Sequence, residues 1–149
     1  MHARFASSML AIRDIDHLVL CVRDSAAMEA FYCRVLGAVV ERRRPDLGLL
    51  HLRAGASQID LVAIDGPLGL QGGAAPGKEG RNLDHFCLNV EPFDVDAIVA
   101  HLKANDVPVG EIRERFGASG TGLTIYLTDP EGNTVELKGS SQHGPGAKR

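Results

Sequence analysis

The chain has no run of apolar residues that approaches the roughly 20 needed to cross a membrane as a helix. Its formal net charge is only −3, which gives no electrostatic basis for binding nucleic acid or an anionic membrane surface. The N-terminal stretch has no long apolar segment and does not resemble a signal peptide. These absences lead us to expect a cytoplasmic protein with no nucleic-acid or membrane partner.

Cysteine is also scarce, since the only thiols are Cys21, Cys33 and Cys87. An odd number without paired spacing argues against a disulfide framework and for a reducing compartment. Cys21 and Cys87 fall within expected strands, and we interpret both as buried free thiols.

One short basic run, residues 42–44, consists of arginines flanked by Glu41 and Asp46. Charged side chains commonly protect the exposed edge of a sheet, which is our main interpretation of this run. The alternative is an anion clamp for a substrate, because guanidinium groups suit carboxylates and phosphates.

What the chain does contain is a fragment that occurs twice. Residues 15–22 recur as residues 83–90, and Asp, His, Leu and Val keep their places in both copies. Each copy leads into a helical pattern and then into strand patterns. A chain of 149 residues is one domain or two small modules that share a core, and the repeat favours two modules.

The first module opens with a strand over residues 14–22. Asp24 or Ser25 then suits the N-cap of an amphipathic helix that runs to Leu36, and Gly37 is a natural stop. Three short strands are expected at residues 39–43, 47–53 and 58–64. The first module is therefore predicted to be βαβββ.

A linker rich in Gly and Pro, residues 65–82, joins the modules or acts as a lid. The second module repeats the order of the first. Its expected elements are a strand from Leu83, a helix around residues 95–102 capped by Asp94, strands at 109–115, 123–128 and 134–138, a Gly-rich loop at 116–122 and a turn at 129–133. We predict an α+β fold of two βαβββ modules at residues 12–64 and 83–139, with an N-terminal arm at 1–11 and a flexible tail at 140–149.

Each module offers a histidine on its first strand and a carboxylate on its last. The histidines are His17 and His85, and the carboxylates are Asp60 and Glu136. Since side chains alternate along a strand, each carboxylate points away from the face that its apolar neighbours bury. A carboxylate in such a place is unstable without a partner, and one divalent metal ion would satisfy all four groups. The pattern predicts a metal site.

These residues resemble the vicinal oxygen chelate superfamily, which includes glyoxalases, fosfomycin- and bleomycin-resistance proteins and extradiol dioxygenases. The resemblance is carried by residues 16–20, 31–37, 83–86 and 126–137. The last segment, with Asp129-Pro130-Glu131-Gly132-Asn133 inside it, is the most specific. The resemblance covers roughly residues 12–139 and implies paired βαβββ modules whose curled mixed sheet forms a metal-holding cup.

The resemblance also implies a ligand set and a reaction class. His17, His85 and Glu136 match the metal ligands of most metal-using members, and the expected ion is Fe, Mn, Ni, Co or Zn. In many small members the cup forms between the chains of a homodimer, so one histidine comes from the neighbouring subunit. Such a set leaves positions open for a small oxygen-bearing substrate, which the metal activates as a Lewis acid. We expect a lyase- or isomerase-type enzyme with Asp60 or Glu136 as its base.

Three positions depart from the pattern of the glutathione-using glyoxalases. Asp60 stands where those enzymes carry a longer Glu or Gln as a fourth ligand, so it acts as a ligand, as a base or through a water. Cys21 replaces an Arg, and Ile64 replaces an Asn, that help to hold glutathione. These differences argue against methylglyoxal–glutathione chemistry, unless another arginine such as Arg42 or Arg81 substitutes.

Other functions of the superfamily are alternatives. Ring-cleaving oxygenation usually needs a further acid–base histidine, and His51 is either that residue or a surface or packed one. Fosfomycin-type chemistry needs an anion-binding loop, and residues 116–122 are either such a loop or a plain hairpin. Tyr126 is a candidate substrate contact or acid, or else a core tyrosine. A bleomycin-resistance-type binding protein would use no metal, and the presence of the ligand set counts against it.

Overall fold

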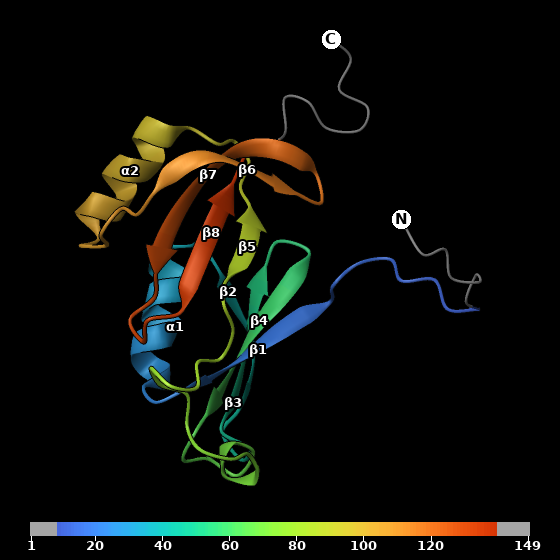
Figure 1. Cartoon of the computed structure of the whole chain (residues 1–149). Helices are drawn as coiled ribbons and strands as arrows, with labels where there is room; N and C mark the ends of the chain where they lie inside the picture. Colours follow the sequence, from blue (N-terminus) through green and yellow to red (C-terminus); the bar gives the residue numbers. More distant parts are fainter. Residues whose placement is uncertain (1–8, 140–149) are drawn as a thin grey trace.

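The structure is a computed structural model that describes residues 9–139. The expected tail at residues 140–149 and residues 1–8 of the expected arm lie outside the described residues. Within residues 9–139, two α-helices and eight strands form two mixed four-stranded sheets (Figure 1). The α+β class expected from the sequence is confirmed. Neither helix is long and apolar enough to span a membrane.

The first sheet has the strand order β1-β4-β3-β2, with β1 parallel to β4 and the other pairs antiparallel. Its elements are β1 (His17–Val22), α1 (Ser25–Arg34), β2 (Val39–Arg44), β3 (Leu49–Ala54) and β4 (Ser57–Ala63). As the sequence predicts, the Asp24 carboxylate caps α1 by accepting a hydrogen bond from the backbone N–H of Ala27. Gly37 follows the helix with a φ of +75°, a conformation that glycine adopts without strain.

The second sheet repeats this plan in the order β5-β8-β7-β6, again with one parallel pair. Its elements are β5 (Phe86–Asn89), α2 (Val95–Ala104), β6 (Ile112–Gly117), β7 (Gly120–Thr128) and β8 (Thr134–Lys138). Asp94 caps α2 as Asp24 caps α1. The linker between the sheets contains a short 3-10 helix, η1 (Gly69–Gln71).

The loop expected at residues 116–122 is shorter than predicted, and of its two interpretations the structure has the plain hairpin. β6 runs through Gly117, β7 starts at Gly120, and these two residues pair across a tight hairpin. Backbone hydrogen bonds hold this hairpin, and they need no apolar side chains to form. The strand expected at 109–115 accordingly begins later, at Ile112.

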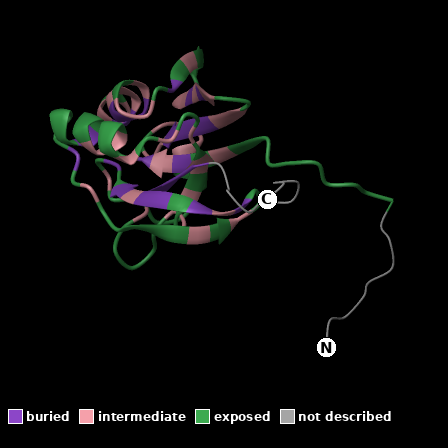
Figure 2. Ribbon diagram, turned by 90° about the horizontal axis from the view of Figure 1, so that it is seen from above, coloured by how far each residue is buried: buried purple, intermediate pink, exposed green. Residues whose placement is uncertain are grey.

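The apolar faces of both sheets pack into one core that includes buried residues of the two helices (Figure 2). Tyr32 of α1 is fully buried and stacks on Phe86 of β5 with ring centroids 6.4 Å apart. In Figure 1, α1 lies beside the β7–β8 end of the second sheet as well as beside its own sheet. The opposite face of each sheet is therefore left to carry the polar side chains.

The turn between β7 and β8 joins the modules. The Asp129 carboxylate accepts a hydrogen bond of 2.8 Å from the Tyr32 hydroxyl, and the Glu131 carboxylate accepts hydrogen bonds from the backbone N–H groups of Arg23 and Asp24. Asn82 donates to Asn133 and also bonds both backbone groups of Cys21. The most specific motif of the sequence thus ties the second module to the start of α1.

Candidate functional site

The second module brings His85 and Glu136 together. His85 directly precedes β5, and Glu136 lies on the adjacent strand β8, where it is 5% exposed. Nε2 of His85 lies 3.3 Å from Oε2 of Glu136. This nitrogen and this oxygen face each other, and both are types of donor that a divalent metal ion binds.

An aspartate orients the histidine in each module. Nδ1 of His85 lies 2.6 Å from Asp84, and Nδ1 of His17 lies 2.7 Å from Asp16. When Nδ1–H donates to the carboxylate, the lone pair on Nε2 is free to bind a metal ion. The hydrogen bond that His17 donates to Asp16 raises the pKa of His17 above its ordinary value, and the one that His85 donates to Asp84 lowers the pKa of Asp84.

In the first module the buried carboxylate faces a different partner. Asp60 is 4% exposed on β4, and its Oδ1 lies 3.0 Å from Nδ1 of His51 on β3. His17, on β1, is paired with Asp16 and feels the charge of Asp60 only at longer range, as a minor contribution to its raised pKa. The histidine and the carboxylate of this module are thus not in the close contact seen for His85 and Glu136.

Cationic and aromatic side chains share the face of the second sheet that carries Glu136. The Tyr126 ring lies 5.7 Å from the His85 ring, and the Arg115 guanidinium lies 3.9 Å above the Tyr126 ring. Lys138 is 2% exposed, two residues beyond Glu136, and donates to the Ser119 hydroxyl. The arrangement can hold the negative oxygen of a substrate beside a metal ion.

Arg115 and Lys138 are not among the residues expected from the sequence. Arg115 is held by Thr124 and by Glu111, and its Nε is buried without a hydrogen-bond partner in residues 9–139. The available signal was strand alternation, since Lys138 lies on the same face as Glu136.

The structure also tests the expectations for the arginine run at residues 42–44 and for the cysteines. Arg43 pairs with Glu29 and Arg44 pairs with Asp46, which fits a solvated sheet edge. The three cysteines are free, but the expected burial is wrong for both strand cysteines: Cys21 is only half-buried, and Cys87, which pairs with Glu136 across β5 and β8, is exposed. Partial burial, reinforced by the nearby Glu136 carboxylate, raises the pKa of the Cys87 thiol to about 11.

One chain does not assemble the whole predicted ligand set. Within residues 9–139, no three His, Cys, Asp or Glu side chains lie close enough to hold a metal ion. His85 and Glu136 form a pair, Tyr126 lies beside them, and His17 and Asp60 belong to the other sheet. Completion of the set requires a further group, such as a residue of a second chain.

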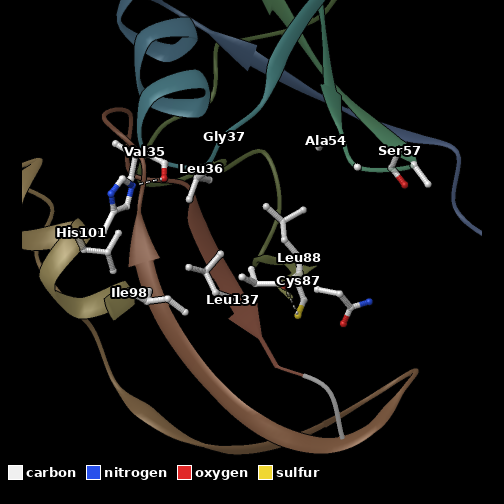
Figure 3. Close-up of a pocket in the computed structure, with 15 residues that line it drawn as sticks. Val35, Leu36, Gly37, Ala54, Ser57, Cys87, Leu88, Ile98, His101 and Leu137 are labelled. Carbon is white, nitrogen blue, oxygen red and sulfur yellow. Dashed lines mark hydrogen bonds between the residues drawn. The ribbon is translucent and has the colours of Figure 1, made fainter. Parts of the chain in front are cut away.

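A cavity of about 520 Å³ lies between the modules, away from these groups (Figure 3). It is bounded by the end of α1, the β3–β4 turn, β5 and α2, and neither His17, His85 nor Glu136 lines it. His101 lies at its edge, where Nε2 is 2.8 Å from the carbonyl oxygen of Val35. This histidine is exposed on α2, as expected, and it links the two modules.

Comparisons with known proteins agree with this architecture. Uncharacterized protein YaeR of Escherichia coli (strain K12) is 30% identical over 141 residues, covering 87% of this chain and 98% of YaeR. Virulence protein STM3117 of Salmonella typhimurium is 31% identical over 132 residues, covering 88% of this chain and 87% of that protein.

Solved structures share the fold. The crystal structure of STM3117 matches with a TM-score of 0.70 at 28% identity, covering 89% of this chain and all 100% of that one. Lactoylglutathione lyase from Agrobacterium tumefaciens matches with a TM-score of 0.61 at 24% identity, covering 85% and 92%, which is a likeness of fold alone. A sequence profile matches residues 14–137, and the chain therefore belongs to the Glyoxalase/Bleomycin resistance protein/Dioxygenase superfamily.

Proposed function

We propose that the protein is a cytoplasmic, divalent-metal-dependent, glyoxalase-like enzyme that acts on a small oxygen-bearing substrate by Lewis-acid catalysis, as a lyase or isomerase. The observation that carries this proposal is the convergence of His85 and Glu136 at 3.3 Å. The lyase or isomerase class is supported by membership of a superfamily that includes the glyoxalases. A bound metal would polarise a substrate oxygen and hold the charge that develops on it.

The donor groups fit a divalent metal. The aspartates at Nδ1 of His17 and His85 leave both Nε2 atoms available, and Glu136 supplies an anionic oxygen. Two imidazoles and one carboxylate suit Fe, Mn, Ni, Co and Zn, and they leave coordination positions open. His17, His85 and Glu136 are therefore our proposed ligands.

We further propose that the ligand set is completed in a homodimer. β1 and β5 are both edge strands of their sheets, and His17 and His85 lie on or beside these edges. An edge strand carries unpaired backbone groups that favour a neighbour. Placing β1 of one copy beside β5 of another would bring His17 of the first to His85 and Glu136 of the second.

The decisive experiment has two stages. The first measures metal per chain by mass spectrometry after anaerobic purification without chelator, together with the molar mass in solution. We expect about one divalent ion per chain in a dimer. A monomer that takes up no metal on titration would contradict the proposal and favour a binding protein without turnover.

The second stage mixes two variants, His17→Ala and His85→Ala. Neither variant should bind metal as a homodimer, because each lacks a ligand in every site. In the mixed dimer, one site combines both substitutions and the other combines His17, His85 and Glu136 of intact type. Recovery of one metal ion per two chains would therefore be the signature of a shared site, and no recovery would contradict it.

A further inference from the structure

We propose that His51 and Asp60 form an acid–base dyad, in which Asp60 positions the imidazole and Nε2 of His51 transfers a proton to and from the substrate. The dyad rests on the proposed function, because it assigns the base of that same reaction. In this proposal His51 is the general base, a role that the sequence had led us to expect for Asp60 or Glu136.

The two side chains face each other across one hairpin. His51 and Asp60 are direct partners in the antiparallel pairing of β3 with β4, and Nδ1 lies 3.0 Å from Oδ1. Both atoms are sealed from solvent, and neither has an aligned hydrogen-bond partner within residues 9–139. A buried polar atom without a partner is destabilising, so a small rotation of the ring that aligns this pair is favourable.

Only one member of the pair reaches solvent. The Asp60 side chain is 6% exposed and the His51 side chain is 20% exposed. Since Nδ1 is the sealed nitrogen, Nε2 is the one left to meet a substrate. An Nδ1–H donated to Asp60 fixes the tautomer that has its lone pair on Nε2, and the carboxylate stabilises the imidazolium once a proton is accepted.

A second metal site is the competing interpretation of two facing, buried donor atoms. It is disfavoured because both donor atoms are sealed from solvent inside one chain, which leaves no access for ligands from a second chain or from a substrate. His17 is also held by Asp16 rather than by this pair. A shared proton satisfies both atoms without a third group.

The substrate class that suits the dyad is a carbonyl compound such as an α-hydroxy ketone, because the carbonyl takes up the electron pair when a base removes a proton from the neighbouring carbon. Nε2 of His51 removes a proton from the carbon beside the carbonyl. The C–H bond breaks, its electron pair forms a C=C bond, the carbonyl π electrons move to oxygen, and a new N–H bond forms. Return of the proton to the same carbon restores the substrate, so the step is visible as exchange of that hydrogen with solvent.

The kinetic test uses zinc-loaded protein with hydroxyacetone in deuterated water, and follows loss of the carbon-bound proton by NMR. His51→Gln should slow exchange by about 100-fold to 10,000-fold, the usual contribution of a general base. Metal per chain should stay unchanged. The matched control is His101→Gln, which alters a histidine outside the polar faces and should exchange at the wild-type rate.

The positional test uses ¹⁵N NMR of the imidazole rings, with the His51 signals identified by their loss in His51→Gln. Wild type should show the proton on Nδ1 and the lone pair on Nε2. Asp60→Ala removes the acceptor and should shift His51 toward the opposite tautomer. A purely structural Asp60 would leave the tautomer as it is. Asp60→Asn, which keeps the shape and removes the charge, should slow exchange while retaining metal.

Four results would overturn the dyad. They are loss of metal in His51→Gln, exchange at the wild-type rate in that variant, no exchange of hydroxyacetone by metal-loaded wild type, and an unchanged tautomer in Asp60→Ala. Failure of the proposed function looks different, because wild type would then take up no metal while the tautomer test still decides the contact between Asp60 and His51.

Discussion

The two modules share a backbone plan but differ in what approaches the buried carboxylate. In each, a hairpin sets a ring directly opposite the acid: His51 opposite Asp60, and Tyr126 opposite Glu136. In the first module this ring is the partner, at 3.0 Å. In the second the partner is His85, which comes from the strand on the other side at 3.3 Å. The two carboxylates thus occupy equivalent strand positions, but each contacts a histidine from a different neighbouring strand or loop.

This difference shows how a duplicated fold can supply two kinds of chemistry. Pairing a carboxylate with an oriented histidine whose Nε2 points at it gives two donors that a metal ion can bind, as proposed for the second module. Pairing it with a histidine through Nδ1 leaves Nε2 for proton transfer, as proposed for the first. Breaking each contact separately tests whether the modules are specialised or equivalent.

The largest effect is expected from the carboxylates themselves. Glu136→Gln removes an anionic ligand and should lower metal affinity by more than about 100-fold, beyond the range typical of groups that only orient ligands. Asp60→Asn should leave metal affinity within the error of titration. Equal losses in both variants would show that the modules are equivalent and that Asp60 is a fourth ligand. Circular dichroism of both proteins serves as the folding control.

The next largest effect on metal affinity is expected from the aspartates that accept a hydrogen bond from Nδ1 of His17 and His85, a feature that both modules share. Asp84→Asn should weaken metal binding about 10-fold to 100-fold, because the ligand histidine loses the group that fixes its tautomer and orientation. Asp16→Asn should weaken it to a similar degree if His17 is a ligand. Competition against a chelating indicator measures both. An effect confined to Asp84→Asn would remove His17 from the ligand set.

A smaller effect, on the free energy of unfolding, is expected to differ between the two tyrosines of the chain. Tyr32→Phe removes a buried hydroxyl that donates to the Asp129 carboxylate between the modules, and should lower the free energy of unfolding by about 1 to 3 kcal/mol. Tyr126→Phe is the matched control, since its hydroxyl makes no hydrogen bond within residues 9–139, and should change stability by less than about 0.5 kcal/mol. Urea denaturation measures both. Equal changes would mean that the turn does not join the modules.

Local signals explain which parts of the fold the sequence could predict. Both helices begin at the expected caps, Asp24 and Asp94, because a cap bonds a backbone group only three residues away. The tight turn of the β6–β7 hairpin was not predicted, because glycines and charged residues hide the strand character of residues 116–122. The bond between Tyr32 and Asp129 joins residues 97 apart, and no local pattern indicates it.

In the candidate site, too, some contacts follow from local sequence patterns and others do not. The placement of His85 beside Glu136 follows from duplication and strand alternation. The contact of His51 with Asp60 depends on the register of β3 with β4, which the tight turn after Ala54 sets. The sequence of this hairpin therefore predicts that the two residues lie opposite each other. The proposed contact of His17 with His85 and Glu136 depends on how two chains would assemble, which no periodicity within one chain encodes.

The smallest expected effect is a pH-dependent change in stability, which involves α1 but not α2. Glu29 of α1 pairs with Arg43 of β2, while no ion pair joins α2 to a strand within residues 9–139. The hydrogen bond from Arg43 lowers the pKa of Glu29 below its ordinary 4.5. A carboxyl whose pKa is lower in the folded state adds stability above its unfolded pKa, and this addition is lost as the pH falls through the folded pKa.

Arg43→Gln should therefore destabilise the protein only slightly, since exposed ion pairs are weak, and the difference from wild type should vanish in acid. Urea denaturation at neutral pH and below the lowered pKa of Glu29 gives the comparison. Lys103→Gln in α2 is the control, because that lysine has no carboxylate partner within residues 9–139 and its effect should not change over the same range. A difference for Arg43→Gln that persists in acid would mean that packing of the arginine stem, and not its charge, holds α1 against β2.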